Sequence, residues 1–379
     1  MARFDLQTRG GLDIDAEMLV VRQLSAPSRA DMKALWARLP GGPVSTPFQS
    51  PRYFESFQRH MVGPVNGELS IYSIEHRGLS LPLMLIPVLV RRRGPIRIAS
   101  MPDLTLADQN APVLARGIPL SGRVLKSCWT AFLGCLDRAD VLDIFNIPPA
   151  VDGMANPLFE LDACETYTEA LTFDLTDEQA EARWRKKSVY KEARAKMRKL
   201  EGQGAEFFVA TDPQDRVDVF SKLLADRRQR LRGLTRAACA ETGPKDRFYA
   251  DLAANTGPDN PAQVFGIRAG EELIAGAIGM MTGKTFNGVL ISIGDPKWHK
   301  LSPGIVLISQ IIEWAKAHGI ETFCFGTGLQ SYKQRFGAVS QPMRRLNVPL
   351  TFAGRAYIKM RKAKDVLKAG NVFLRVQKS

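Results

Sequence analysis

Apolar and polar positions alternate along the chain in two successive runs of predicted strands and helices. The first run predicts strands over 69–75, 79–90 and 141–146, with a helix over 120–136 before the last strand. The second run predicts strands over 264–268, 273–281, 285–293 and 321–325, with a helix over 303–318 before the last strand. Alternation with a period of two identifies strands, whereas apolar spacings of three and four identify helices. The shared order predicts a mixed α/β chain built from two related halves.

The division of the chain follows from these two runs. We assign residues 1–160 to an N-terminal half, 161–260 to a mainly helical connecting segment of the second half, 261–354 to a C-terminal core and 355–379 to a basic amphipathic tail. Up to about residue 50 the sequence predicts mostly irregular structure, with a helical patch over 31–39 and then a helix over 51–61. The break between the halves is expected near Gly153 to Glu169.

The composition is that of an ordinary globular protein. Of the 379 residues, 45% are hydrophobic and 24% are charged, and this length suffices for two cores. No segment approaches the roughly 20 apolar residues of a membrane-spanning helix, and the acidic N-terminus lacks the apolar region of a signal peptide. The five cysteines form no CxxC pair, and the four histidines form no HExxH motif. We therefore expect a cytoplasmic protein that binds no metal.

The net charge of +13 implies an acidic partner or surface. Two segments concentrate this charge, at 183–199 and 355–378, and both are predicted to be helices. Their apolar stripes are Val189, Ala193, Met197 and Leu200 in the first, and Tyr357, Met360, Ala363 and Leu367 in the second. A basic amphipathic helix can lie on an anionic membrane, contact nucleic acid or bind a phosphorylated ligand, and it can equally be an ordinary solvated face. Nucleic acid fits least, because few aromatic residues accompany the basic ones.

The start of the predicted helix over 303–318 has the features of a phosphate site. Ser302 stands at the N-cap, Pro303 takes the first helical position, and Gly304 lets a ligand approach the backbone. Free amides and the positive end of the helix dipole attract anions there. His299 and Lys300 precede this start and add charge. A helix that is merely well capped is the alternative interpretation.

The segment FCFGTGLQSYKQRFG places two glycines at the end of the last predicted strand. A polar helix start follows, with Tyr332, Lys333 and Arg335. Ligands of open α/β sheets bind beyond the carboxyl ends of strands. Because the strand over 285–293 also ends in a glycine-containing loop, the two ends together indicate a binding site.

This order of strand, SPG-led helix, strand, GTG and YKQRFG resembles the GNAT acetyltransferases of the cellulose-biosynthesis (CelD/BcsL) type. The resemblance covers most of the chain, including TPFQSPRYF, PDLTLADQNAPVL and the basic KKSVYKEARAKMRKLE. The family is also similar to the FemABX-type peptidoglycan aminoacyl transferases. The resemblance implies tandem GNAT-like halves, each a central mixed sheet flanked by helices. It further implies acyl transfer from coenzyme A to an amine or hydroxyl, in cell-surface polysaccharide or envelope biosynthesis.

The phosphate loop departs from the usual GNAT pattern of Gln or Arg, two residues, Gly, one residue, then Gly or Ala. With Gly304 in the last position, His299 stands at the first and Ser302 replaces the middle glycine. The donor is therefore left open among acetyl-CoA, a longer acyl-CoA and an aminoacyl-tRNA. The resemblance assigns donor binding to Leu290, Ile291, Ser292, His299, Lys300, Ser302 and Gly304.

In the GNAT pattern the acceptor attacks the thioester directly, and no cysteine here has the context of an activated nucleophile. A backbone amide within 290–293 is expected to polarise the thioester carbonyl. The resemblance makes Tyr332 the general acid toward the departing thiolate. Asp108 of LADQN is the first candidate for the general base, with Asp103 the second and a water chain the third. Acceptor binding is assigned to Asp103, Asn110, Lys333 and Arg335.

Four functions fit these observations. We favour a CoA-dependent acyltransferase that acts on a sugar or envelope precursor. The second is acylation of a lipid amine, with the basic helices on the inner membrane surface, and the third is aminoacyl transfer from tRNA. The fourth is a binding module that has lost coenzyme A, which the altered phosphate loop keeps open.

Overall fold

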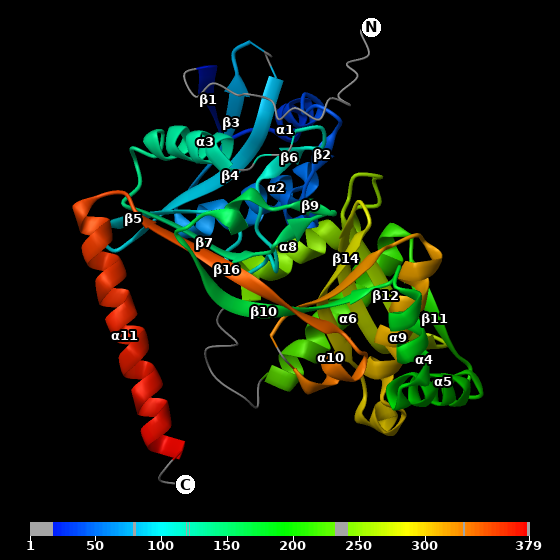
Figure 1. Cartoon of the computed structure of the whole chain (residues 1–379). Helices are drawn as coiled ribbons and strands as arrows, with labels where there is room; N and C mark the ends of the chain where they lie inside the picture. Colours follow the sequence, from blue (N-terminus) through cyan, green and yellow to red (C-terminus); the bar gives the residue numbers. More distant parts are fainter. Residues whose placement is uncertain are drawn as a thin grey trace, which may run out of the picture.

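A computed structural model describes residues 18–78, 81–118, 120, 122–231, 242–328 and 330–376. Residues 1–17, for which the sequence predicts no signal peptide, lie outside these ranges. Leu79, at the start of one predicted strand, and Cys239 also lie outside them. The described chain forms one large mixed sheet of 14 strands flanked by helices (Figure 1). The sheet order is β1-β3-β4-β5-β7-β16-β10-β15-β14-β13-β12-β11, with the short β2 (Pro43–Val44) and β6 (Val113–Ala115) beside β4.

Each end of the sheet is a five-stranded unit with the same connections. The first unit consists of β1 (Leu19–Ser25), β3 (Glu68–His76), β4 (Leu81–Arg93), β5 (Ile96–Ser100) and β7 (Val141–Ile147). The second consists of β11 (Ala205–Ala210), β12 (Ala262–Ala269), β13 (Glu272–Thr282), β14 (Thr285–Ile293) and β15 (Thr322–Thr327). In both units only the last pair is parallel, because a helix crosses between its two strands. The prediction of two related halves in a mixed α/β fold is confirmed.

Two long strands join the units. Strand β10 (Cys164–Asp174) pairs with β15, and β16 (Val339–Pro349) pairs with β7. The two strands also pair antiparallel with each other. Since β16 belongs to the end of the chain, the C-terminal part of the sequence completes the sheet of the N-terminal half.

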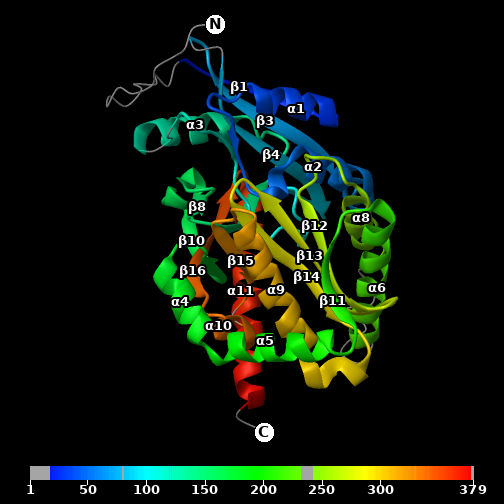
Figure 2. The ribbon, with the colours of Figure 1, turned by 90° about the vertical axis from the view of Figure 1, so that its right-hand side faces the viewer.

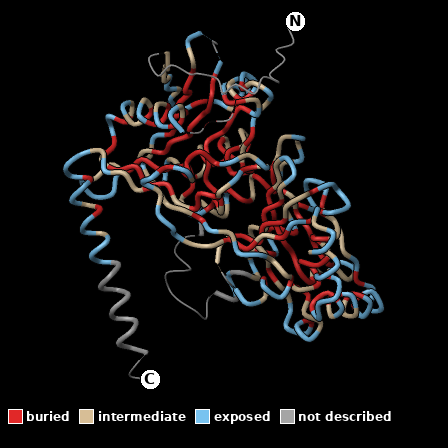
Figure 3. Tube along the Cα trace, in the orientation of Figure 1, coloured by how far each residue is buried: buried red, intermediate tan, exposed pale blue. Residues whose placement is uncertain are grey.

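Helices cover both faces of the second unit (Figure 2). One face carries α4 (Glu178–Lys186), α5 (Ser188–Glu201) and α9 (Pro303–Ala317), and the other carries α6 (Pro213–Leu231) and α8 (Thr242–Ala254). The first unit is covered by α1 (Arg29–Ala37), α2 (Pro51–Phe57) and α3 (Gly122–Gly134). Aromatic contacts link α2 to α8, where the Tyr53 and Phe248 rings lie 5.1 Å apart, edge to face. Buried residues therefore continue from the first half into the second (Figure 3).

Several expected elements differ from the structure. The described part of the segment up to residue 50, residues 18–50, is not mostly irregular, because 19–25 form the edge strand β1 paired along its whole length with β3. The basic run over 183–199 divides at Lys187 into α4 and α5 rather than forming one helix. The segment 161–260 holds strands β10 and β11 besides its helices. The boundary near residue 160 stays a prediction.

The apolar stripes predicted for the two basic segments differ in how far the structure buries them. Val189, Ala193, Met197 and Leu200 are all buried beneath α5, so this prediction is confirmed. The C-terminal helix α11 (Phe352–Val376) projects from the body instead, and Met360 and Ala363 are exposed (Figure 1). Its main apolar contact is Ile358, because the helix touches the sheet only near its start. The side chain of Leu367 lies outside the described residues. No helix in the described ranges has the length and apolar character needed to cross a membrane.

Candidate functional site

A slot opens where the parallel strands β14 and β15 separate. Their pairing covers Thr285–Thr322, Phe286–Phe323 and Asn287–Cys324 and then ends. In the neighbouring ladder, Ile278 faces Leu290 while Gly279 faces Gly288, so Val289 is an extra residue in β14. Such a β-bulge bends a strand locally. Beyond Asn287, the edge of β14 that faces β15 has no ladder partner among the described strands, which leaves backbone groups free for a ligand.

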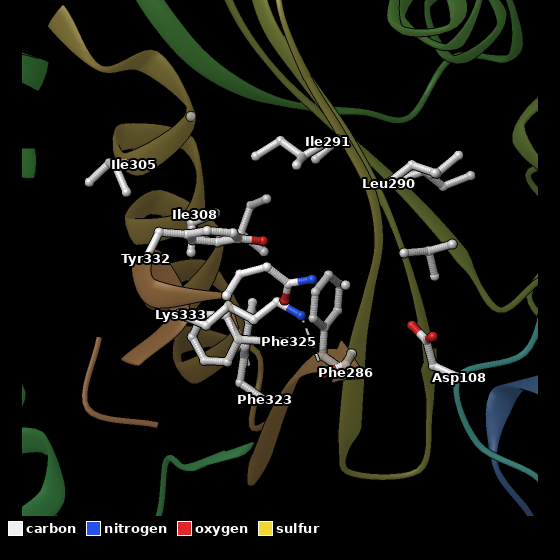
Figure 4. A pocket seen from close by; sticks show the side chains of 18 of the residues that line it. Asp108, Phe286, Leu290, Ile291, Ile305, Ile308, Phe323, Phe325, Tyr332 and Lys333 are labelled. Carbon is white, nitrogen blue, oxygen red and sulfur yellow. Dashed lines mark hydrogen bonds between the residues drawn. The ribbon is translucent and has the colours of Figure 1, made fainter. Parts of the chain in front are cut away.

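The slot has a volume of about 580 Å³ and reaches from the start of α9 into the core. Strand register and helix position define three levels. The mouth is lined by Ile293, Gly304 and Ile305, the middle by Asp108, Leu290, Thr327, Tyr332 and Lys333, and the floor by Phe286, Ile308, Ile311 and Phe323. Figure 4 shows Tyr332 and Ile308 on the α9 side, with Asp108 across β14 from them. The slot thus passes between the strands and reaches both faces of the sheet.

The mouth lies at the N-terminus of α9. Gly304 is buried there, and a Cβ on this residue would lie 3.1 Å from Ile293 Cδ1. Ser302 adopts a left-handed conformation with φ of +46°, and its side chain makes no capping bond, contrary to the prediction. Instead, Ser302 Oγ accepts a hydrogen bond of 2.6 Å from Lys196 Nζ on α5. This lysine adds a positive charge to a helix end that already attracts anions.

A chain of ion pairs holds Lys196 beside this helix end. Glu192 accepts hydrogen bonds of 2.6 Å from Lys196 and 2.6 Å from Arg335 of α10 (Ser331–Arg335). The hydrogen bonds from these two cations lower the pKa of Glu192. Arg335 is consequently held at the surface and does not line the slot, unlike Lys333. The sequence did not single out Lys196, although its spacing of four from Glu192 is typical of a helical ion pair.

Asp108 comes from the first half and lies partly buried in the middle of the slot. Burial raises its pKa from 3.8 to about 6, although the nearby Lys333 ammonium and a hydrogen bond from Thr327 favour the charged form. Thr327 Oγ1 donates to Asp108 Oδ1 at 3.4 Å. Gly326 makes this approach possible, because a Cβ there would lie 2.7 Å from Asp108 Oδ2. The prediction that Asp108 reaches across to the second half is confirmed in position, and its role as base stays a prediction.

Lys333 is 4% exposed, and its ammonium group lies against the carbonyl oxygens at the end of β15. Its Nζ donates to the carbonyl oxygen of Thr327 at 2.9 Å and to those of Gly326 and Gly328 at 3.4 Å. Burial lowers the pKa of this ammonium, while Asp108 raises it. Lys333 therefore holds the GTG turn in shape beside Asp108. Tyr332, the next residue, lines the slot, and its role as general acid stays a prediction.

The corresponding gap in the first half is filled by the chain itself. Strands β5 and β7 pair only at Ile98–Val141 and Ala99–Leu142. Beyond these pairs the loop after β5 bonds along β7: the Asn110 amide donates to the Asn146 carbonyl at 2.8 Å, and Asn110 Nδ2 donates to the Phe145 carbonyl at 2.9 Å. The same loop that occupies the first gap carries Asp108 to the open one.

Two predicted acceptor-binding residues stabilise this loop and do not line the slot. Asp103 accepts a 2.6 Å hydrogen bond from Asn110 Nδ2 and bonds from the amides of Leu106 and Ala107. Both Asp103 and Asn110 are almost fully buried. Burial raises the pKa of Asp103 to about 6 despite these bonds. Asp103 and Asn110 therefore support the loop that carries Asp108, and neither side chain lines the slot.

The remaining predicted donor residues divide by position. Leu290, Ile291 and Gly304 line the slot. Ser292 of the same strand is buried but does not line the slot. His299 and Lys300 are exposed on the turn before α9.

Residues 187–334 match the Acetyltransferase (GNAT) domain family. The matched segment contains α5, the bulged β14, α9, β15 and most of α10. No curated protein matches the sequence significantly. Residues 187–334 therefore carry a GNAT acetyltransferase domain, which supports the resemblance over this segment.

Solved structures share the fold over most of the chain at low sequence identity. FemX has a TM-score of 0.57 at 10% identity, covering 86% of this chain and 97% of that one. A conserved protein of unknown function from Bacteroides thetaiotaomicron has a TM-score of 0.53 at 10% identity, covering 87% and 100%. A tandem GNAT protein from the clavulanic acid biosynthesis pathway has a TM-score of 0.46 at 11% identity, covering 88% and 99%.

Proposed function

Because residues 187–334 form a GNAT acyltransferase domain, we propose that the chain transfers an acyl group from a coenzyme A thioester in the slot between β14 and β15. The acceptor is an amine or hydroxyl of a sugar-linked or cell-envelope precursor. The observation that carries the proposal is the separation of the two strands at the Val289 bulge, which opens β14 backbone groups beside Asp108 and Tyr332.

The donor's pyrophosphate binds at the mouth. The first amides of α9 attract it, and Gly304 keeps the approach clear. Ser302 replaces the middle glycine of the usual GNAT loop, and Lys196 compensates with an ammonium group hydrogen-bonded to Ser302. His299 and Lys300 add positive charge on the exposed turn before the helix. The pantetheine arm then follows β14 into the slot, where unpaired backbone groups satisfy its amides.

Transfer occurs in the middle of the slot by direct attack. The acceptor nitrogen or oxygen bonds to the thioester carbonyl carbon, its proton passes to the Asp108 carboxylate, and the carbon–sulfur bond breaks. An amide at the bulge, near Leu290 and Ile291, stabilises the negative charge that develops on the carbonyl oxygen. The Tyr332 phenol protonates the departing thiolate. Since Asp108 lies across β14 from Tyr332 and α9, the acceptor enters from the side of the first half.

The proposal is tested by thermal melting of the full chain with free CoA, acetyl-CoA and longer acyl-CoAs. A ligand at 100 times its dissociation constant stabilises the folded state by about 2.7 kcal/mol, which a melt resolves. The shift should vanish in Gly304→Trp, whose side chain would fill the mouth. A flat response of the native chain to every thioester and to CoA would exclude a CoA-dependent reaction.

The projecting helix α11 favours a second candidate, in which the acceptor is an amine of a membrane lipid. Its first turns expose Phe352 and Met360 together with Arg355 and Lys359, a combination suited to an anionic membrane surface. Under this alternative, the chain should sediment with vesicles containing anionic lipid at low salt and be released at high salt, because surface electrostatics are screened. Failure to sediment at low salt would exclude it and leave a water-dissolved acceptor.

A further inference from the structure

The floor of the slot is apolar and deeply buried. Phe286 and Phe323 stack with their ring centroids 5.0 Å apart and an interplanar angle of 28°. Ile308 and Ile311 of α9 lie over them, and all four side chains are at most 9% exposed although they line the cavity. The cavity therefore continues into the hydrophobic core and does not end at the reacting groups.

The floor lies beyond the place where the thioester reacts. Asp108, Thr327 and Lys333 mark that place, level with the bulge at Val289. Phe286 precedes the bulge by three residues, which is about 10 Å of strand. An acetyl group ends at its methyl carbon, one bond past the carbonyl, so it leaves most of this depth empty.

Glycine keeps the passage from the middle to the floor open. Gly288 is the last residue of β14 that pairs with β13 before the bulge. A Cβ on Gly288 would meet no other atom closer than the Cys324 carbonyl oxygen at 3.7 Å. Phe325, which is level with Gly288 in the strand register, is a further apolar lining residue, and the charged groups of the slot remain at the middle level. The lower slot thus offers apolar surface and no charge to whatever enters it.

We propose that the acyl group is an aliphatic chain longer than acetyl, and that the stacked Phe286 and Phe323 rings with Ile308 and Ile311 form its binding pocket. This inference rests on the proposed thioester-dependent function and names its substrate class. Burying a methylene group improves affinity by about fourfold, equivalent to about 0.8 kcal/mol. Several methylenes in the lower slot therefore select strongly against acetyl, while the stacked rings limit the chain length.

Calorimetric titration of the full-length chain with free CoA, acetyl-CoA, hexanoyl-CoA and octanoyl-CoA tests the proposal without knowledge of the acceptor. We expect octanoyl-CoA to bind at least tenfold more tightly than acetyl-CoA. Ile311→Phe, which fills the floor, should reduce this ratio to below threefold. Ile305→Phe is the matched control: it lies on the same face of α9 at the mouth, so it should change both affinities by the same factor and leave the ratio intact.

The outcomes separate the inference from the function on which it rests. Acetyl-CoA binding as tightly as octanoyl-CoA would overturn the chain pocket while supporting a CoA-dependent enzyme. Absence of binding by every compound, free CoA included, would overturn the proposed function itself. Should Ile311→Phe fail to fold, Phe323→Leu enlarges the floor instead, and octanoyl-CoA should then gain relative to hexanoyl-CoA. An unchanged ratio in that variant would contradict the floor as the pocket.

Discussion

A single half-buried carboxylate, Asp108, connects the two halves of this chain at the slot. Asp108 is held by a loop that fills the first half's own gap, and it ends beside Thr327 and Lys333 of the second half. Its pKa of about 6 reflects opposing effects, since burial disfavours the carboxylate and Lys333 favours it. A carboxyl group that titrates near neutrality suits a general base, because it can accept a proton and release it again.

Replacing Asp108 by Asn should lower the rate of transfer by roughly a hundredfold or more while making the protein more stable. The rate of the native chain should rise with pH through about 6, because only the carboxylate accepts a proton, and the variant should lack this dependence. The raised pKa means that ionisation costs folding free energy, a cost absent below about pH 4 and complete above about pH 6. Removing the charge should therefore stabilise the fold at pH 8 by up to about 3 kcal/mol.

Asp152→Asn provides the control for this prediction. Its carboxylate binds Arg116 at 2.9 Å and the Lys284 amide at 3.1 Å, away from the slot. The pH–rate profile of this variant should match that of the native chain. An acid limb near pH 6 that persists in Asp108→Asn would assign the titration to another group.

At the scale of elements, α5 and α9 act together at the mouth of the slot. Five buried residues anchor α5, and Lys196 on the same helix reaches Ser302 at the start of α9. Glu192 restrains the lysine through a second hydrogen bond. The proposed phosphate site thus draws on two helices, whereas the sequence pattern attributed it to the start of one helix and the residues just before it.

Lys196→Met should weaken binding of CoA by about tenfold, since a charge-assisted contact to a phosphate contributes on the order of 1.4 kcal/mol. The remaining affinity should depend less steeply on salt, because one phosphate contact is lost. Lys199→Met is the matched control, as Lys199 is exposed on the same helix and should affect CoA binding little. Equal losses in both variants would point to the general basic surface of α5 and away from a specific contact.

At the scale of the molecule, the two halves share one sheet and part of one core. Strands β16 and β10 run between them, and α8 of the second half packs its Phe248 against Tyr53 of the first. Arg345 and Arg361, which follow β15 in the chain, both bind Asp143 of β7, at 2.7 Å and 2.8 Å. Neither half can lose its structure without exposing a buried edge of the other.

We therefore expect a single cooperative unfolding transition. Tryptophan fluorescence and far-UV circular dichroism should give coincident curves in denaturant. Phe248→Ala should cost about 3–5 kcal/mol and move both curves together, because its cavity lies at the contact between the halves. Two separated transitions, of which the variant shifted only one, would show that the halves are independent.

The sequence predicted the second half well because its elements carry local signals. The strand over 285–293 and the start of the helix at Pro303 match the structure, since alternation and an SPG helix start are local features. Asp108 was found through the resemblance, as a loop aspartate has no periodic pattern of its own. Strands β10 and β16 were missed because each is half exposed and finds its partners far away in the chain.

Other site features depend on tertiary contacts that no local pattern encodes. Lys196 points at Ser302 only once α5 packs beside α9. The Val289 bulge requires the pairing of β14 with β13, and the Phe286–Phe323 stack requires the pairing of β14 with β15. Asp103 and Asn110 were assigned to the acceptor because they flank Asp108 in sequence. Their hydrogen bonds to each other and to β7 give them a supporting role instead.

The position of β16 also constrains the order of events during synthesis. β7 is mostly apolar and nearly all buried, and its partner spans Val339–Pro349, about 200 residues later in the chain. A ribosome adds roughly 5–20 residues per second, so the N-terminal half leaves the exit tunnel well before its sheet can be completed. During that interval one edge of β7 has unpaired backbone N–H and C=O groups, which can pair with other nascent chains. A stalled or truncated product would keep that edge permanently, which makes it a ready target for chaperones and proteases.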